Sequence, residues 1–286
     1  MGTSRIGVVG CGLMGAGIAE VCARAGLDVL IAEHSPEAAD RGQQRIAASM
    51  QRAVTRGRLD GTDAETALAR LTFTTRIEEF ADRQLVVEAV AEDEALKTEL
   101  FAVLDRVVEA PDAVLASNTS SIPIMKLGTA TRRPERVIGI HFFNPVPVLR
   151  LVELVPSLLT SDDTLRQAEH FATDLLGKTV VRARDRAGFV VNALLIPYLL
   201  SAVRMMESGL ASADDIDSGM VLGCAHPMGP LRLADLVGLD TVQAAAEAMY
   251  EEFKEPLYSP PPLLLRMVDA GLLGEKSGRG FYDHTA

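Results

Sequence analysis

Two side chains that can exchange a proton flank a stiff segment in the middle of the chain. His141 stands at one end and Glu153 at the other, with Asn144-Pro145 and Pro147 between them. Proline fixes φ and has no N–H, so this segment is expected to be a turn rather than a helix. Residues 150–155 have the pattern of a short strand. A strand, a turn and a second strand could bring the carboxylate to the imidazole and make it a proton acceptor, although such a pair taken alone is more often structural.

A glycine-rich motif near the N-terminus predicts a dinucleotide site. Residues 5–10 form a short apolar run, the motif GCGLMG occupies residues 10–15, and an apolar helical pattern follows to Gly26. A second apolar run at residues 28–32 ends in Glu33. Strand, G-x-G-x-x-G, helix, strand and acidic residue within one βαβ-sized unit are typical of dinucleotide-binding domains.

Each part of this motif has a physical task. Gly10 permits a tight turn, Gly12 lets a pyrophosphate approach the backbone, and Gly15 lets helix and strand pack closely. The N-terminus of the helix offers N–H groups to the phosphates. Glu33 can accept hydrogen bonds from the adenosine ribose and would repel a 2′-phosphate, so NAD is favoured over NADP. The cofactor-binding residues predicted from the motif are Gly10, Gly12, Leu13, Met14 and Gly15.

A long helix is expected over residues 36–58, and one of its faces is basic. Ser49, Arg52 and Arg56 are spaced so that they share this face. In a chain with a formal net charge of −11, a local basic face is a candidate site for a phosphorylated ligand. An ordinary solvated helix face is the alternative, and spacing alone slightly favours it.

Polar side chains follow several of the predicted strands. These strands are expected at residues 71–75, 84–91, 113–116 and 137–141. Glu92 follows the second of them, the run Ser117–Ser121 follows the third, and His141 ends the fourth. Ligands of an open α/β sheet bind beyond the carboxyl ends of its strands, so these groups are expected at one site. Helix capping by Ser120 or Ser121 is the alternative for part of the polar run.

The pattern of the chain changes near residue 185. A last strand is expected at residues 178–184, and only helical patterns broken by glycine and proline follow it. We therefore predict an α/β protein with a Rossmann-type, mostly parallel sheet domain over residues 1–185 and a smaller all-α domain over residues 186–286. The second domain offers Asn192 as a ligand candidate, although asparagine near a helix start is often a cap.

Composition argues against several classes of function. The net charge of −11 and the lack of a basic cluster argue against a nucleic acid or an anionic membrane surface as partner. Three cysteines without C-x-x-C spacing predict neither a disulfide framework nor a metal site. Residues 189–206 are strongly apolar, but polar residues and a proline interrupt them, so a buried helix is expected. Without a signal-peptide pattern, the expected location is the cytoplasm.

Together with these residues, several longer motifs resemble the L-3-hydroxyacyl-CoA dehydrogenase family, in particular its short bacterial members that act on 3-hydroxybutyryl-CoA. The resemblance extends from about residue 5 to residue 283. The motifs that carry it are GCGLMGAGIA (10–19), VVEAVAE (86–92), SNTSS (117–121), HFFNPVPVLRLVE (141–153), GFVVN (188–192), GCAHPMGPLRLADLVGLD (223–240) and KSGRGFYD (276–283).

The resemblance implies a role for each matching position. It implies that His141 is the catalytic base, that Glu153 is its partner, and that three further residues contact the substrate or position the histidine. These are Ser120, Asn144 and Asn192. The cofactor contacts that it adds to the glycine motif are Glu33, Glu92, Lys97 and Asn118. The contacts to coenzyme A that it implies are Ser49, Arg52 and Arg56.

The resemblance also implies an NAD-binding Rossmann domain and a helical domain through which two subunits form a homodimer. Two departures are mild: Arg56 stands where the family has lysine, and Asp93 stands where many relatives carry an amide. The expected reaction is the NAD-dependent, reversible oxidation of an L-3-hydroxyacyl-CoA to the 3-oxoacyl-CoA. A short-chain substrate, 3-hydroxybutyryl-CoA, is expected, although the sequence itself does not fix the acyl-chain length. One alternative is a dehydrogenase of a free hydroxy or sugar acid on the same fold. Another, from a different class, is a non-catalytic NAD-binding protein.

Overall fold

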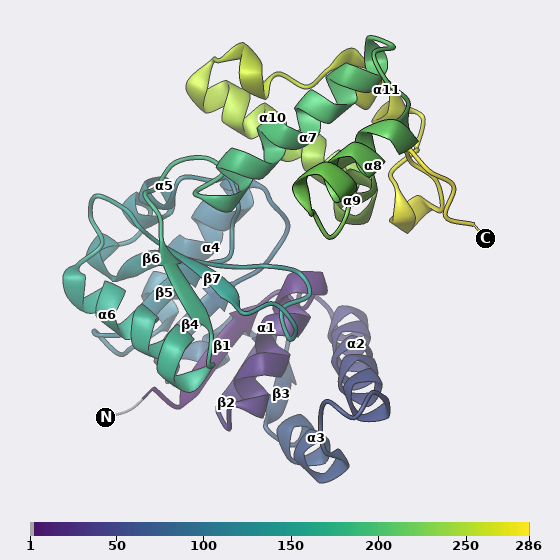
Figure 1. Cartoon of the computed structure of the whole chain (residues 1–286). Helices are drawn as coiled ribbons and strands as arrows, with labels where there is room; N and C mark the ends of the chain where they lie inside the picture. The colour runs from purple at the N-terminus through teal and green to yellow at the C-terminus, as the bar shows by residue number, and fades with distance from the viewer. Residues whose placement is uncertain (1–2, 286) are drawn as a thin grey trace. The chain divides into compact units, whose positions relative to one another are not determined.

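The computed structural model describes residues 3–285, and its chain divides into two compact units, Met1–Asp185 and Arg186–Ala286 (Figure 1). The first unit is built on one eight-stranded sheet with the strand order β3-β2-β1-β4-β5-β6-β7-β8. Its strands are β1 (Arg5–Val9), β2 (Asp28–Ala32), β3 (Leu71–Thr74), β4 (Leu85–Glu88), β5 (Val114–Ser117), β6 (Val137–Phe142), β7 (Leu151–Pro156) and β8 (Thr179–Arg182).

Strand direction places the carboxyl ends of six strands at one edge of the sheet. β1 to β6 all pair in parallel, β7 pairs antiparallel with β6, and β8 pairs parallel with β7. β4, β5 and β6 are buried along their whole length, as expected for central strands covered on both faces. The chain returns across the sheet between β3 and β4, so β1 and β4 form the switch point at which such folds bind ligands.

Six helices connect these strands. They are α1 (Leu13–Arg24), α2 (Pro36–Thr55), α3 (Gly61–Leu68), α4 (Glu94–Val107), α5 (Ile124–Thr129) and α6 (Asp162–His170), the last continued by a π-helical turn at Phe171–Leu175. Side-chain caps begin four of them: Ser35 accepts from the N–H of Ala38, Asp60 from that of Thr62, Asp93 from that of Leu96, and Ser161 from that of Thr164. Asp93, the departure noted above, therefore has a structural task at the start of α4.

The second unit is helical. Its helices are α7 (Val191–Glu207), α8 (Ala213–Cys224), α9 (Pro230–Val237), α10 (Leu239–Phe253) and α11 (Pro262–Asp269). Leu199, Leu200 and Val203 of α7 are fully buried in its core. The predicted fold class, a mostly parallel sheet domain followed by a helical domain, is thus confirmed. Between residues 3 and 285, no helix is long and apolar enough to cross a membrane.

Two buried aspartates organise the second unit. Asp217 accepts hydrogen bonds from the N–H groups of Leu231 and Arg232, at 2.8 and 2.9 Å, and from the Tyr282 hydroxyl at 2.9 Å. Asp235, which is fully buried, accepts from the backbone of residues 281–282 and contacts the imidazole of His284. These carboxylates tie α8, α9 and the C-terminal segment together. A Cβ at residue 280 would meet Asp235 Oδ1 at 2.1 Å, so glycine is needed at this position of the 276–283 motif.

We expect Asp217→Ala to destabilise the protein by about 2–3 kcal/mol, because two helix N–H groups and a hydroxyl lose their charged acceptor. Asp214→Ala on the same helix is the matched control, because the Asp214 side chain is 81% exposed and makes only a loose contact with Arg232, at 3.8 Å. This control should change the stability by less than about 0.5 kcal/mol. Urea unfolding followed by circular dichroism measures both. Equal stability of the two variants would contradict the role given to Asp217.

Candidate active site

The register of two strands brings the predicted proton acceptor and its partner together. His141 lies directly opposite Glu153 in the antiparallel pair β6–β7. His141 Nδ1 is 2.8 Å from Glu153 Oε2. The His141 side chain is 8% exposed and the Glu153 side chain is fully buried. Two polar groups at this depth need partners, and each supplies one to the other.

The segment between them forms the expected turn. The Asn144-Pro145 peptide bond is cis, and both residues are exposed. Lys178 holds the turn from the start of β8, because its ammonium donates to the carbonyl oxygens of Val146 and Leu149 at 2.6 and 2.7 Å. Nothing in the linear sequence pointed to Lys178.

The loop between β1 and α1 has the geometry that a dinucleotide requires. Gly10 has φ +88°, a conformation that favours glycine. A Cβ at Gly15 would lie 1.8 Å from the carbonyl oxygen of Gly10, whereas a Cβ at Gly12 would meet no atom within 4 Å. Gly15 is therefore needed for packing, and Gly12 faces open space that a pyrophosphate can approach. Glu33 Oε1 accepts from the N–H of Cys11, which holds the carboxylate against this loop.

A buried ionic network lies beside the glycine loop and was not predicted. Glu88 ends β4, is fully buried, and binds Lys97 Nζ at 2.8 and 3.1 Å. Lys97 Nζ is also 2.9 Å from Glu92 Oε2. Ser117 Oγ donates to Glu88 at 2.6 Å, and the N–H of Val90 donates at 2.7 Å. This last bond turns the chain and ends β4 at Glu88, short of the predicted strand end at residue 91. A carboxylate within an apolar run, nine residues before a lysine, was the available signal.

Glu92 gathers the polar loop that follows β5. Its Oε1 accepts from the hydroxyls of Thr119 and Ser121 and from the N–H of Ser120. Burial alone would raise the pKa of Glu92, but the Lys97 ammonium and these hydrogen bonds hold it below its ordinary value. Capping of this turn by Ser120 or Ser121 was the alternative considered above, but Thr119 makes the turn, since its Oγ1 accepts from the N–H of Ile122 at 2.9 Å. Within residues 3–285, the Ser120 hydroxyl itself has no hydrogen-bond partner.

Asn118 joins this loop to the histidine strand. Its side-chain oxygen accepts from the N–H of Phe142 at 2.9 Å, and its own N–H donates to Glu88 O. The ends of β4, β5 and β6 are therefore linked by hydrogen bonds. The glycine loop, Glu33, the buried ionic network and the His141–Glu153 pair therefore all lie at one edge of the sheet.

Comparison with known proteins agrees with this geometry. Residues 5–186 match the NAD-binding domain of 3-hydroxyacyl-CoA dehydrogenase, and residues 188–284 match the C-terminal domain of the same family. The chain belongs to the 3-hydroxyacyl-CoA dehydrogenase family.

Individual relatives extend over almost all of the chain. A 3-hydroxybutyryl-CoA dehydrogenase of Mycobacterium tuberculosis is 61% identical over 280 residues, which is 98% of both chains. The crystal structure of FadB2 from the same organism superposes with a TM-score of 0.98, at 60% identity and 99% coverage of both chains. The (S)-3-hydroxybutyryl-CoA dehydrogenase PaaH1 of Ralstonia eutropha gives a TM-score of 0.93 at 43% identity, covering 99% of this chain and all of that one.

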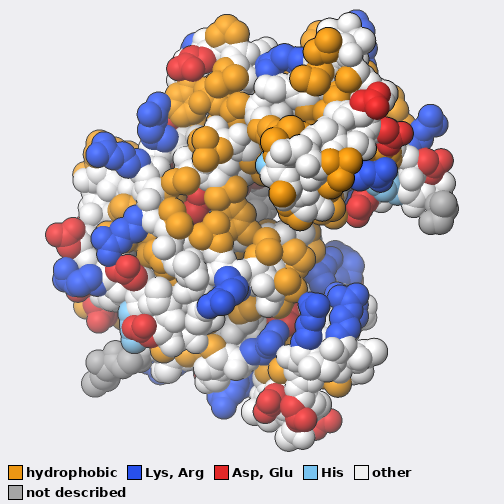
Figure 2. Space-filling view, in the orientation of Figure 1, with side chains coloured by type: hydrophobic (Ala, Val, Ile, Leu, Met, Phe, Trp, Pro, Cys, Tyr) orange, Lys and Arg blue, Asp and Glu red, His pale blue; other side chains and the backbone are white. Residues whose placement is uncertain are grey.

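The basic helix of this dehydrogenase-family chain is α2. Ser49 is half-buried, and Arg52 and Arg56 are exposed; Arg56 is the C-cap residue. In Figure 2, Lys and Arg side chains gather on the first unit near α1 and α2. Asn192 is the second residue of α7 in the other unit, and the N-cap position is Val190. The alternative that Asn192 caps this helix is therefore wrong.

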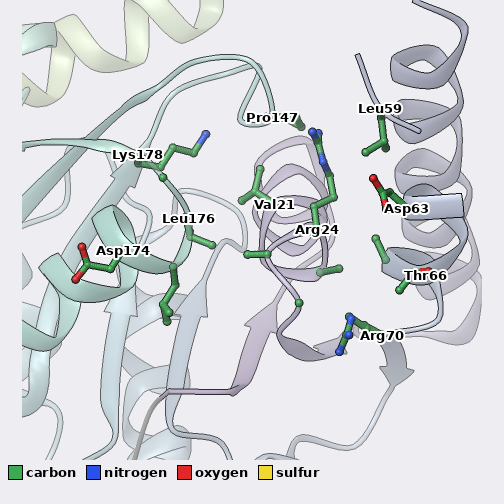
Figure 3. A pocket seen from close by; sticks show the side chains of 16 residues that line it. Val21, Arg24, Leu59, Asp63, Thr66, Arg70, Pro147, Asp174, Leu176 and Lys178 are labelled. Atoms are coloured by element: carbon green, nitrogen blue, oxygen red, sulfur yellow. The ribbon is translucent and has the colours of Figure 1, made fainter. Parts of the chain in front are cut away.

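The first unit also contains a cavity of about 650 Å³. It opens at the C-terminal end of α1, between α3 and the turn before β8, and Arg24, Arg70 and Lys178 contribute to its walls (Figure 3). None of its 16 lining residues is a predicted site residue. The glycine loop precedes the opposite end of α1, so cavity size does not identify the site in this family member.

We expect Lys97→Met to destabilise the chain by about 3–5 kcal/mol, because it leaves the carboxylate of Glu88 buried without its counter-ion. Lys126→Met is the matched control: Lys126 pairs with Glu94 at 2.7 Å, but both side chains are about half exposed, at 53% and 50%. Such a pair contributes less than about 1 kcal/mol. Thermal unfolding of the two variants measures the difference, and a similar loss in both would refute the buried network.

Proposed function

We propose that this chain catalyses the reversible oxidation of L-3-hydroxyacyl-CoA to 3-oxoacyl-CoA with NAD, and that its substrate is the short 3-hydroxybutyryl-CoA. The observation that carries the proposal is the buried contact of 2.8 Å between His141 and Glu153, at the sheet edge that also carries the glycine loop. Full-length similarity to relatives named 3-hydroxybutyryl-CoA dehydrogenase supports the short substrate.

His141 acts as the general base in this proposal. In the proposed tautomer the Nδ1–H group of His141 donates a hydrogen bond to Glu153 Oε2, and Nε2 is therefore the nitrogen that accepts the proton of the substrate's C3 hydroxyl. The buried carboxylate then stabilises the imidazolium that forms. In the reverse direction the imidazolium returns the proton to the 3-oxo group. A positioned base of this kind contributes about 10²–10⁴-fold to the rate.

The glycine loop and the residues beside it hold the cofactor. When bound, NAD accepts the hydride that leaves C3 of the substrate. Gly10, Gly12 and Gly15, with Leu13 and Met14 at the start of α1, cradle the pyrophosphate, and Glu33 binds the adenosine ribose. Glu92 is 40% exposed and can reach the ligand, whereas Lys97 is 2% exposed and supports Glu92 from behind. Asn118 keeps this loop fixed to the histidine strand.

Other polar groups position the substrate. The Ser120 hydroxyl and the amides of Asn144 and Asn192 bind the reacting oxygen or the thioester carbonyl, and fixed positions of this kind supply much of the remaining rate enhancement. Ser49, Arg52 and Arg56 of α2 bind the phosphates of coenzyme A, because guanidinium groups pair well with phosphate oxygens.

The second unit is proposed to form a homodimer interface. Several of its large apolar side chains are exposed, including Leu194, Leu210 and Leu222 at 75%, 73% and 84%. Exposed apolar residues of this size on one unit support a contact with a second copy of the chain.

We expect His141→Ala to lower kcat for acetoacetyl-CoA reduction by about 10²–10⁴-fold, because the base is lost. NADH affinity should stay within about twofold. His170→Ala is the control, since His170 pairs with Asp174 at the surface and is half exposed; it should behave as wild type. Steady-state kinetics and NADH fluorescence titration measure the two quantities. Near-normal turnover of the His141→Ala variant would contradict the assignment of His141 as the general base.

We expect the chain to oxidise 3-hydroxybutyryl-CoA and to leave free 3-hydroxybutyrate almost unused, because α2 is proposed to bind the coenzyme A phosphates. Arg56→Gln should raise KM for the thioester about tenfold and leave kcat nearly unchanged. Arg58→Gln, which changes an arginine just beyond the helix, should raise this KM only slightly. Comparable kcat/KM for the free acid and the thioester would instead favour a hydroxy-acid dehydrogenase.

A further inference from the structure

Two opposite charges meet at Cys11 in the glycine loop. Glu33, at the end of β2, accepts from the N–H of Cys11. Arg45, in the third turn of α2, donates from Nη1 to the carbonyl oxygen of the same residue at 2.7 Å. A carboxylate and a guanidinium are thus both fixed to the backbone of one residue, within the loop that is proposed to hold the cofactor.

Close packing fixes Arg45 in this place. Gly42 precedes Arg45 by almost one turn of α2, and a Cβ at Gly42 would lie 2.6 Å from the Cys11 sulfur. The helix therefore lies directly against the loop. Burial and the Glu33 carboxylate raise the pKa of the Cys11 thiol to about 12, while the Arg45 guanidinium opposes that rise. The carboxylate and the guanidinium therefore both act on Cys11.

Arg45 forms no ion pair within the described part of the chain. Among residues 3–285 it has no carboxylate within 4.0 Å, and its side chain is exposed. His34 adds a second basic group, with Nδ1 at 3.1 Å from Glu33 Oε2, and Arg41 lies one turn earlier on α2. Glu33, only 12% exposed, is the acidic member of an otherwise basic group.

Dinucleotide-binding sites distinguish NAD from NADP at the position that Glu33 occupies, after the second strand. An acidic residue binds the adenosine ribose hydroxyls of NAD, and an arginine nearby accommodates the 2′-phosphate of NADP. We propose that Arg45 is a coenzyme-specificity residue that forms the positive half of a ribose 2′-phosphate site, which the Glu33 carboxylate closes to NADP. This inference rests on the proposed binding of NAD at the glycine loop. In this proposal the selectivity for NAD depends on the Glu33 carboxylate alone, because the Arg45 guanidinium that can bind a phosphate is already in place.

Five variants test the proposal: Glu33→Gln, Arg45→Gln, Glu33→Gln combined with Arg45→Gln, Glu33→Gln combined with Arg45→Lys, and Arg58→Gln as a control that removes one arginine outside the loop. With acetoacetyl-CoA as substrate, Glu33→Gln should raise the ratio of kcat/KM for NADPH to that for NADH at least tenfold. Adding Arg45→Gln should reverse most of this gain, and adding Arg45→Lys should keep it. Arg58→Gln should leave the ratio unchanged. Thermal unfolding confirms that each variant is folded.

Calorimetric binding of 2′,5′-ADP and 5′-AMP gives a second readout that does not need activity. In the Glu33→Gln background, 2′,5′-ADP should bind at least tenfold more tightly than 5′-AMP, and Arg45→Gln should abolish the difference. Equal 2′,5′-ADP affinity with and without Arg45 would overturn the proposal, as would loss of binding in Arg56→Gln instead, which would place the ligand on the coenzyme A face. Wild-type inactivity toward acetoacetyl-CoA would overturn the proposed function and leave this binding test valid.

Discussion

The antiparallel register of β6 and β7 is the constraint on which the rest of the site depends. It places Glu153 opposite His141, at a separation of 2.8 Å between Oε2 and Nδ1. β6 is also the last of six parallel strands, so its carboxyl end lies at the same edge as the glycine loop. A slip of one residue in the pairing would point Glu153 to the other face of the sheet. The turn held by Lys178 fixes this register from outside the pair.

The acidic side chains at this edge are bound by specific partners. Glu88 is buried but bound by Lys97, Ser117 and a backbone N–H, and Glu92 shares the same lysine. A buried carboxylate without such partners would destabilise the fold, so each of these contacts constrains the strand end that carries it. Asn118 extends the same network to β6. The cofactor loop and the base are thereby parts of one hydrogen-bonded edge.

Much of this arrangement follows from local pattern. The glycine motif, the apolar strands, the change to helices near residue 185 and the proline-rich turn all have short-range signals, and the structure shows these elements. The family resemblance is likewise confirmed. Contacts between distant residues have no such signal. The contacts of Lys178 with the proline-rich turn and of Arg45 with Cys11 depend on how the elements pack. Thr119, rather than a neighbouring serine, makes the turn after β5. The roles of His141, Glu153 and the other site residues stay predictions.

The claim that His141 and Glu153 act as one unit has a direct test. Single-turnover reduction of acetoacetyl-CoA by NADH is measured for wild type, His141→Gln, Glu153→Gln and the double variant. If the carboxylate acts only through the imidazole, the double variant will be no slower than His141→Gln alone. Rate losses that multiply in the double variant would show that the two residues act independently, and would contradict the account.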